Sequence, residues 1–116
     1  MASSPTRYSC PVEVTIDVIG AKWAPVILAH LKQQPLRYAQ LRRLMPRTSE
    51  KMLAQRLREL EASGLVRRRA DDVVPPRVDY SLTGQGRTLA PVLQALYDWG
   101  AEWAEENGIT IEIENL

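Results

Sequence analysis

Arginine and lysine side chains gather in the middle of this 116-residue chain, although its overall net charge is only +1. Residues 32–77 contain twelve basic side chains against five acidic ones, a net charge of +7, whereas residues 98–116 carry six acidic side chains and no basic one. The chemistry open to such a cluster is the binding of phosphate and other anionic groups. The asymmetry predicts an anionic partner for the middle of the chain, with an ordinary patchy surface as the alternative.

Few side chains are of the types that catalysis or metal binding requires. The single cysteine, Cys10, cannot form an internal disulfide, and the single histidine, His30, leaves a zinc site short of ligands. The adjacent Asp71 and Asp72 are typical of a solvated turn rather than of a catalytic pair. The chain has no nucleotide-binding loop and no serine-histidine-aspartate set. We therefore expect a protein that is not an enzyme and that uses no cofactor and no metal.

Length and hydropathy narrow the class of protein further. A chain of 116 residues, with 45% apolar and 25% charged residues, is one ordinary globular domain. Its apolar runs are a few residues long, whereas a membrane span needs about 20. Residues 1–6 are small and polar, unlike the apolar segment of a secretory signal. We expect a cytoplasmic protein that makes no membrane contact.

Hydrophobic periodicity and turn residues divide the chain into short elements. We expect helices over 11–19, 22–31, 38–45 and 49–63, strands over 65–70 and 77–82, and a long helix that follows Thr83 and ends at Asn107. Thr48 or Ser49 is expected to cap the fourth helix. Pro91 lies inside the last helix and must kink or restart it.

This order of elements is mainly helical with a small β-hairpin, and it predicts a winged helix-turn-helix domain with additional N- and C-terminal helices. The domain would occupy residues 10–106, after a flexible lead-in over 1–9 and before a tail over 107–116 that is either strand or frayed. The helix after the turn has one leucine face and one polar face, which suits a major groove about 12 Å wide. The expected base-contacting residues are Thr48, Ser49, Lys51, Met52, Gln55 and Arg58.

The turn and the hairpin beside this helix are rich in arginine, which suits contacts to phosphate rather than to bases. In a strand, Arg67 and Arg69 share one face and Arg68 lies on the other, so the three cannot all contact DNA. The expected backbone-contacting residues are Arg37, Arg42, Arg43, Arg47, Arg67, Arg69 and Arg77. The alternative is a winged helix that binds an acidic protein in place of DNA.

Several motifs resemble the HxlR family, bacterial winged-helix transcriptional regulators related to the MarR type. They are Cys10-Pro11-Val12, Ile19-Gly20-Ala21-Lys22-Trp23, Leu36-Arg37-Tyr38-Ala39-Gln40-Leu41-Arg42-Arg43, Leu57-Arg58-Glu59-Leu60-Glu61, Gly64-Leu65-Val66, Val74-Pro75-Pro76-Arg77-Val78-Asp79-Tyr80-Ser81-Leu82-Thr83 and Trp99-Gly100. The motifs run through nearly the whole domain. The resemblance implies a homodimer, built mainly from the N- and C-terminal helices, that binds a pseudo-palindromic operator in double-stranded DNA.

The terminal helices fit that implication, because they offer more apolar surface than so small a domain needs to bury. The expected dimer-interface residues are Val12, Leu96, Trp99 and Trp103, with monomeric packing as the alternative. MarR-like dimers often hold small ligands beside the dimer helices, so a small aromatic effector is a further expected partner. Trp23, Tyr97 and Trp99 could line such a cleft, but core packing is the role expected for these aromatics.

Cys10 occupies the place of the single N-terminal cysteine through which several HxlR-like regulators sense oxidants, quinones or other electrophiles. The resemblance therefore implies a redox sensor that responds to a small electrophile. Immediately before Pro11, the thiol would lie at a helix N-terminus, where the dipole favours the thiolate. Free cysteines also serve as small buried residues, so packing is the alternative.

Overall fold

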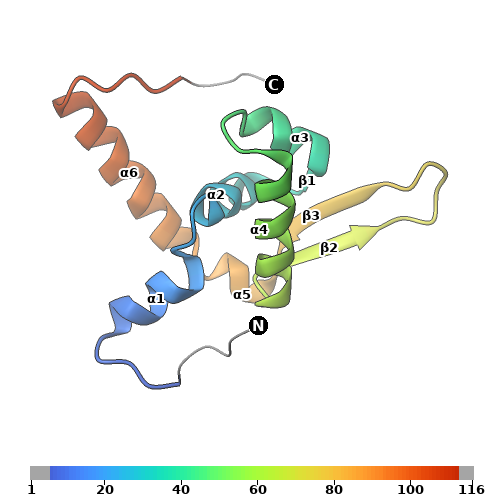
Figure 1. Ribbon diagram of the computed structural model, residues 1–116, viewed down its shortest axis with the longest axis horizontal. Coiled ribbons are helices and arrows are strands. Elements are labelled where there is room, and N and C mark those ends of the chain that lie inside the picture. Colours follow the sequence, from blue (N-terminus) through green and yellow to red (C-terminus); the bar gives the residue numbers. More distant parts are fainter. Residues whose placement is uncertain (1–5, 113–116) are drawn as a thin grey trace.

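The computed structural model describes residues 6–112, which form a helical body with a projecting hairpin (Figure 1). In chain order the elements are α1 (Pro11–Ile19), α2 (Ala24–Gln33), β1 (Leu36–Arg37), α3 (Tyr38–Leu44), α4 (Glu50–Ala62), β2 (Val66–Ala70), β3 (Val78–Leu82), α5 (Gly84–Arg87) and α6 (Ala90–Glu106). The predicted helices and both predicted strands are present. The structure adds β1 and divides the last helix.

Individual residues at the helix ends explain where α4 begins and ends and where α2 begins. The Oγ of Ser49 accepts a hydrogen bond of 3.1 Å from the backbone N–H of Met52, so Ser49 rather than Thr48 caps α4. Gly64 follows α4 with a φ of +84°, a conformation that favours glycine. Trp23 has a φ of +76°, and α2 therefore begins after it, slightly later than the periodicity predicted.

The expected long C-terminal helix is in fact two helices. Thr83 caps the short α5, since its Oγ1 accepts a hydrogen bond of 3.0 Å from the N–H of Gly86. The long helix α6 begins at Ala90 with Pro91 in its first turn, where a missing N–H costs no helical hydrogen bond. Pro91 therefore restarts the helix, one of the two outcomes that its position predicted.

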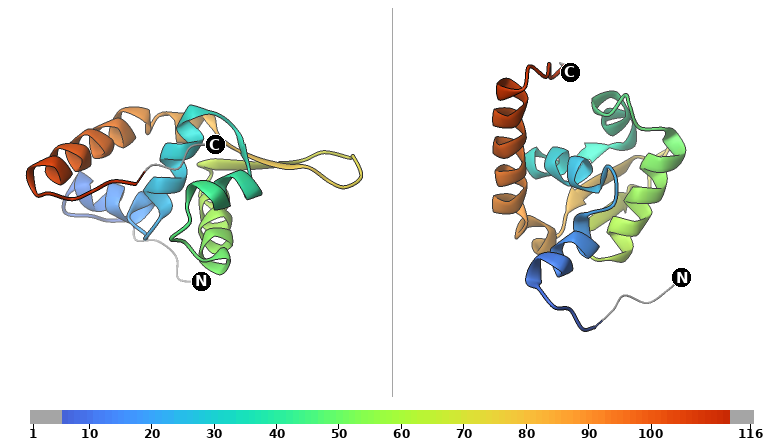
Figure 2. Two further views of the ribbon diagram at one scale, coloured as in Figure 1. Left: turned by 90° about the horizontal axis from the view of Figure 1, so that it is seen from above. Right: turned by 60° about the vertical axis from the view of Figure 1, so that its left-hand side comes forward.

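The predicted hairpin belongs to a three-stranded antiparallel sheet in the order β1–β3–β2. β1 was not predicted, because a strand of two residues is too short to show alternation. Leu36 of β1, Val66 of β2 and Leu82 of β3 are buried, so the base of the sheet joins the core. Beyond this base, β2 and β3 project from the body as the wing (Figure 1, Figure 2).

The core joins α2, α3 and α4 to the base of the sheet. Its fully buried side chains include Ile27 and Leu28 of α2, Leu41 of α3, and Leu53 and Leu57 of α4. With its leucine face held in this core, α4 turns its opposite face to solvent. The arrangement confirms the predicted winged helix-turn-helix fold, in which α3 and α4 enclose the turn and the hairpin forms the wing.

The terminal helices α1 and α6 lie on the side of the molecule away from the wing (Figure 1, Figure 2). At the end of α6 the chain turns back at Gly108, whose φ is +65°, and the N–H of Ile109 donates a hydrogen bond of 2.8 Å to the carbonyl of Ala104. The tail then runs toward α3. Residues 109–112 form no strand, and Ile113, the last member of the predicted alternation, lies outside the described residues.

Candidate nucleic-acid interface

The outward face of α4 carries polar side chains within reach of a ligand. Lys51, Gln55 and Arg58 are exposed, and Met52 is half-buried at the edge of this face. The Nε2 of Gln55 donates a long hydrogen bond of 3.4 Å to the Oε2 of Glu59. Such a long, exposed hydrogen bond can be exchanged for one to a base edge at little cost.

Thr48 lies inside the protein and not on this surface. Its side chain is only 3% exposed, and its Oγ1 is buried with no hydrogen-bond partner among the described residues. The prediction that Thr48 contacts a base is therefore wrong for this structure, because the turn directs the side chain into the body before α4 begins. Ser49 is exposed, and its Oγ is engaged in the helix cap.

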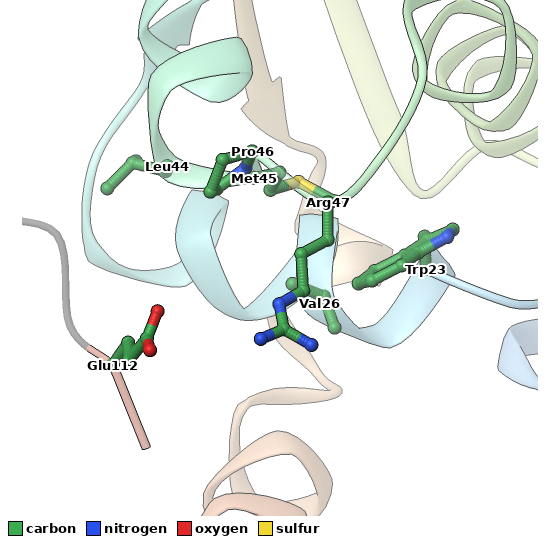
Figure 3. Close-up of a pocket in the computed structure, with 7 residues that line it drawn as sticks. All are labelled: Trp23, Val26, Leu44, Met45, Pro46, Arg47 and Glu112. Carbon is green, nitrogen blue, oxygen red and sulfur yellow. The ribbon is translucent and has the colours of Figure 1, made fainter. Parts of the chain in front are cut away.

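The arginines of the turn differ in their surroundings. Arg42 is half-buried, and its Nη1 donates a hydrogen bond of 3.0 Å to the carbonyl oxygen of Thr48, which holds the turn between α3 and α4. Arg43 and Arg47 are exposed. In this conformation the side chain of Arg47 extends into a pocket between Trp23 and the tail (Figure 3).

The register of the sheet decides which wing arginines share a face. Arg69 lies directly opposite Asp79 of β3, and Arg67 lies two residues before it on the same face. Asp79 also pairs with Arg37 of β1, and the Nε of Arg37 is 3.8 Å from the Oδ1 of Asp79. Arg68 lies on the other face, as the alternation predicted. One sheet face therefore presents three arginines around a single carboxylate.

The wing ends in a loop between β2 and β3. The N–H of Asp71 donates a hydrogen bond of 2.9 Å to the carbonyl of Arg77, which closes the base of this loop. Arg77, Asp71 and Asp72 are all exposed. The loop therefore carries both signs of charge, and Arg77 lies where the loop meets β3.

Arg56 is a functional candidate that was not among the predicted site residues. Its Nε donates a hydrogen bond of 2.8 Å to the carbonyl of Lys22, and its Nη1 forms a 2.8 Å ion pair with Glu59. Arg56 therefore ties α4 to the segment before α2. Helical spacing could have indicated this role. Arg56 follows Leu53 by three residues and precedes Leu60 by four, which places it at the edge of the buried face of α4.

A large apolar surface is exposed on the terminal helices. Trp99 and Trp103 of α6 stack with ring centroids 5.1 Å apart and an interplanar angle of 13°, yet they are 64% and 49% exposed. Leu96 is 50% exposed and Val12 of α1 is 64% exposed. Other exposed apolar residues of α1 are Val14, Ile16 and Val18. The surplus apolar surface predicted for these helices is therefore present in this single chain.

Cys10 lies at the N-terminus of α1, as predicted. It is the N-cap residue, with Pro11 in the first turn, and its side chain is exposed and makes no capping hydrogen bond. The lead-in before it is held against α1, because Tyr8 Oη donates a hydrogen bond of 2.7 Å to the Oδ2 of Asp17. That bond raises the pKa of Tyr8 above its ordinary value. The thiol is thus accessible to a reagent in solution.

The aromatic residues predicted for one effector cleft lie apart. Trp23 lines the pocket of Figure 3. Tyr97 and Trp99 are 67% and 64% exposed, so the expected core packing is wrong for both, whereas Trp23 is partly buried against the core. Burial lowers the pKa of His30 below its ordinary value.

Residues 6–112 contain neither a metal-binding cluster nor a membrane-spanning helix. No group of three or more histidine, cysteine, aspartate and glutamate side chains in this part of the chain is arranged to hold a metal ion. No helix within it is long and apolar enough to cross a membrane.

The buried turn, the two-sided α4 and the basic wing define a winged helix-turn-helix protein of the kind found among transcriptional regulators. Residues 18–108 match the family described as HxlR-like helix-turn-helix, and the chain belongs to this family. It is a helix-turn-helix transcriptional regulator, and its family consists of regulators rather than enzymes.

Individual relatives agree with this assignment. YkvN of Bacillus subtilis (strain 168), an uncharacterised HTH-type transcriptional regulator, is 49% identical over 100 residues, which cover 86% of this chain and 85% of YkvN. The redox regulator HypR in its oxidised form is 45% identical, with a TM-score of 0.77 over 80% of this chain and 96% of HypR. Diamide-treated YodB from B. subtilis is 33% identical, with a TM-score of 0.68 over 83% of this chain and 96% of YodB.

Proposed function

We propose that the protein is a dimeric, sequence-specific DNA-binding transcriptional regulator with α4 as its recognition helix. The observation that carries this proposal is the two-sided character of α4, in which Leu53 and Leu57 are fully buried and Gln55 is exposed. A helix docked firmly on one face can offer donors and acceptors to the major groove on the other. The base-contacting residues are Ser49, Lys51, Met52, Gln55 and Arg58.

The turn and the wing hold the DNA backbone on either side of the recognition helix. The phosphate-contacting residues are Arg37, Arg42, Arg43, Arg47, Arg67, Arg69 and Arg77. Contacts of this kind set position and orientation, whereas α4 reads the sequence. Because each neutralised phosphate releases counterions, the affinity should fall by about 0.9 log unit per tenfold rise in salt for each contact.

A second copy of the chain covers the apolar surface of α1 and α6. Support comes from Trp99 and Trp103, which are large, stacked, and 64% and 49% exposed, a poor arrangement for a monomer in water. Two-fold pairing through these helices leaves both wings free. The two α4 helices should then lie about 34–36 Å apart, one turn of DNA, and read a pseudo-palindrome.

Cys10 is the sensor of this regulator. Its exposed thiol at the N-cap of α1 supports the assignment, as does the likeness to the redox regulator HypR and to diamide-treated YodB. Oxidation by diamide would join two Cys10 thiols, one from each copy, as the two hydrogens pass to the diamide. A disulfide at α1 would change the spacing of the recognition helices and release the operator.

The proposal is tested by selecting bound fragments from genomic or random DNA and measuring their affinity by fluorescence anisotropy at several salt concentrations. We expect enrichment of an inverted repeat, a stoichiometry of two chains per site, and a steep loss of affinity with salt. No binding to any fragment at low salt would contradict the proposal and favour the alternative of an acidic protein partner.

A further inference from the structure

A carboxylate lies among the polar side chains on the outward face of α4. Glu59 follows Gln55 by one helical turn and comes directly after Arg58, and 46% of its side chain is exposed. Both neighbours are base-contacting residues of the proposed function, so Glu59 lies at the same level of the groove. An unpaired carboxylate is unfavourable there, because the phosphates on either side of the groove repel it.

An ion pair with Arg56 offsets this repulsion. The Nη1 of Arg56 lies 2.8 Å from the Oε1 of Glu59. Arg56 is itself fixed, because its side chain is only 14% exposed and its Nε donates the 2.8 Å hydrogen bond to the carbonyl of Lys22. The pair therefore adds no net charge to the surface, and it holds one oxygen of Glu59 on the side of Arg56.

The second oxygen of Glu59 is left for a base. Among the described residues, Oε2 accepts only the long 3.4 Å hydrogen bond from the Nε2 of Gln55. When Gln55 turns to an adenine, this donor is withdrawn and Oε2 has an unfilled acceptor site. An ionised carboxylate can only accept hydrogen bonds, so it selects a base that offers a donor.

We propose that Glu59 is a specificity-determining residue that accepts a hydrogen bond from the N4 amino group of a cytosine in the operator. Cytosine N4 is a donor in the major groove, and glutamate is a suitable acceptor for it. Adenine N6 is a donor too, but the N7 acceptor beside it repels a carboxylate. The inference rests on the proposed function, since it adds one base contact to the recognition helix.

The spacing along α4 predicts where this cytosine lies. Gln55 and Glu59 are about 5.4 Å apart along the helix axis, one helical turn, and successive bases on a strand are about 3.4 Å apart. The cytosine is therefore within two base pairs of the base that Gln55 reads. Selection from a randomised operator library with Gln55→Ala identifies that base, as the position at which the preference is lost.

The first test exchanges the acceptor for a donor. In Glu59→Gln the side-chain oxygen must face Arg56, because a guanidinium can only donate, and the amide N–H groups then face the groove. We expect the cytosine preference to be replaced by guanine or thymine, whose O6 and O4 accept hydrogen bonds. Unrelated sequences should bind roughly twofold more tightly, since a negative charge beside the DNA is removed. A merely structural role for Glu59 would instead weaken all sequences alike.

Glu61→Gln is the matched control for this variant. It removes the same charge from an exposed position on another side of α4, and its selected operator should be that of the wild type. Urea denaturation verifies that both variants are folded. If Glu59→Gln does not fold, the second test decides, because it can be made on the wild type alone.

The second test alters the base in place of the protein. N4-methylcytosine still pairs with guanine, but its methyl group replaces the N–H that projects into the major groove. We expect this base, placed at the identified position of one half-site, to lower the operator affinity of the wild type roughly tenfold, within the range for one wrong base pair. The affinity of Glu59→Gln should change less than twofold. Fluorescence anisotropy measures both.

The outcomes separate this inference from the proposed function. Three results would overturn the role of Glu59 and leave the recognition helix standing: no cytosine within two base pairs of the Gln55 position, an unchanged cytosine preference in Glu59→Gln, or an undiminished affinity of the wild type for the methylated operator. An equal loss on N4-methylcytosine for both proteins would also overturn it. No binding to any DNA at low salt would contradict the proposed function itself, and this inference with it.

Discussion

The side chain of Arg56 joins the recognition helix to the start of α2: its Nε donates a hydrogen bond of 2.8 Å to the backbone carbonyl of Lys22, 34 residues earlier in the chain. Only 14% of the Arg56 side chain is exposed. A charge-assisted hydrogen bond in such a position fixes the orientation of α4 and stabilises the folded protein.

Replacing Arg56 should therefore affect folding more than DNA contact. We expect Arg56→Ala to lower the free energy of unfolding by about 1.5–3 kcal/mol, the range for hydrogen bonds to charged groups, as measured by urea denaturation. Arg58→Ala is the matched control on the same helix, because Arg58 is exposed. It should change stability by less than about 0.5 kcal/mol and reduce operator binding. The reverse pattern would contradict the roles assigned to these two arginines.

Base reading and backbone holding should be separable by mutation. Gln55→Ala removes an exposed amide of α4 and should change the sequence preference, at a cost of about 1–3 kcal/mol for the preferred operator. Arg77→Ala should weaken all sequences alike and reduce the salt slope by about 1. Selection from a randomised operator library measures the first effect, and anisotropy at several salt concentrations the second. Identical profiles for the two variants would refute this division.

The apolar surface of α6 should hold two copies together. We expect Trp99→Glu to convert the dimer to a monomer in sedimentation experiments, because a charge in a desolvated interface is strongly unfavourable. Val74→Glu is a suitable control, since Val74 lies in the wing loop and is 96% exposed. A monomeric wild type, or a dimeric Trp99→Glu with unchanged affinity, would place the dimer interface elsewhere.

Sensing by Cys10 can be tested with a conservative change. Cys10→Ser should bind the operator with wild-type affinity and lose its response to diamide and to quinones, because a hydroxyl cannot form a disulfide or add to a quinone under these conditions. Gel shifts with and without reagent measure the response, and non-reducing electrophoresis detects the cross-link. A serine variant that still responds would exclude Cys10 as the sensor.

Stability should decrease on mild acidification because of His30. Burial lowers the pKa of this imidazole in the folded protein, so the unfolded chain, whose histidine titrates near pH 6.5, binds the proton first. The free energy of unfolding should therefore be highest above about pH 6.5 and fall as the pH decreases toward the folded pKa. In His30→Gln this decrease should be smaller, as measured by urea denaturation between pH 5 and 7.5. A pH dependence of stability that is the same in His30→Gln and the wild type would show that His30 does not cause the decrease.

Much of the fold could be predicted, since local patterns are sufficient for it. Leucines at helical spacing defined α4, and alternation along residues 77–82 defined β3, because each pattern specifies one element and the face that it buries. The position of Cys10 at a helix start followed from Pro11 in the same way. The choice between Thr48 and Ser49 as the cap stayed open until the hydrogen bond to Met52 decided it.

The sequence by itself thus determined the order of the elements, the polar face of α4 and the basic character of the wing. Only the tertiary structure decided that Thr48 is buried, that Arg56 anchors α4, and that residues from α2, the turn and the tail share one pocket. The physical reason is the sequence separation of the residues involved. Periodicity depends on residues that are a few positions apart, whereas burial and shared pockets depend on distant segments that meet only when the chain has folded.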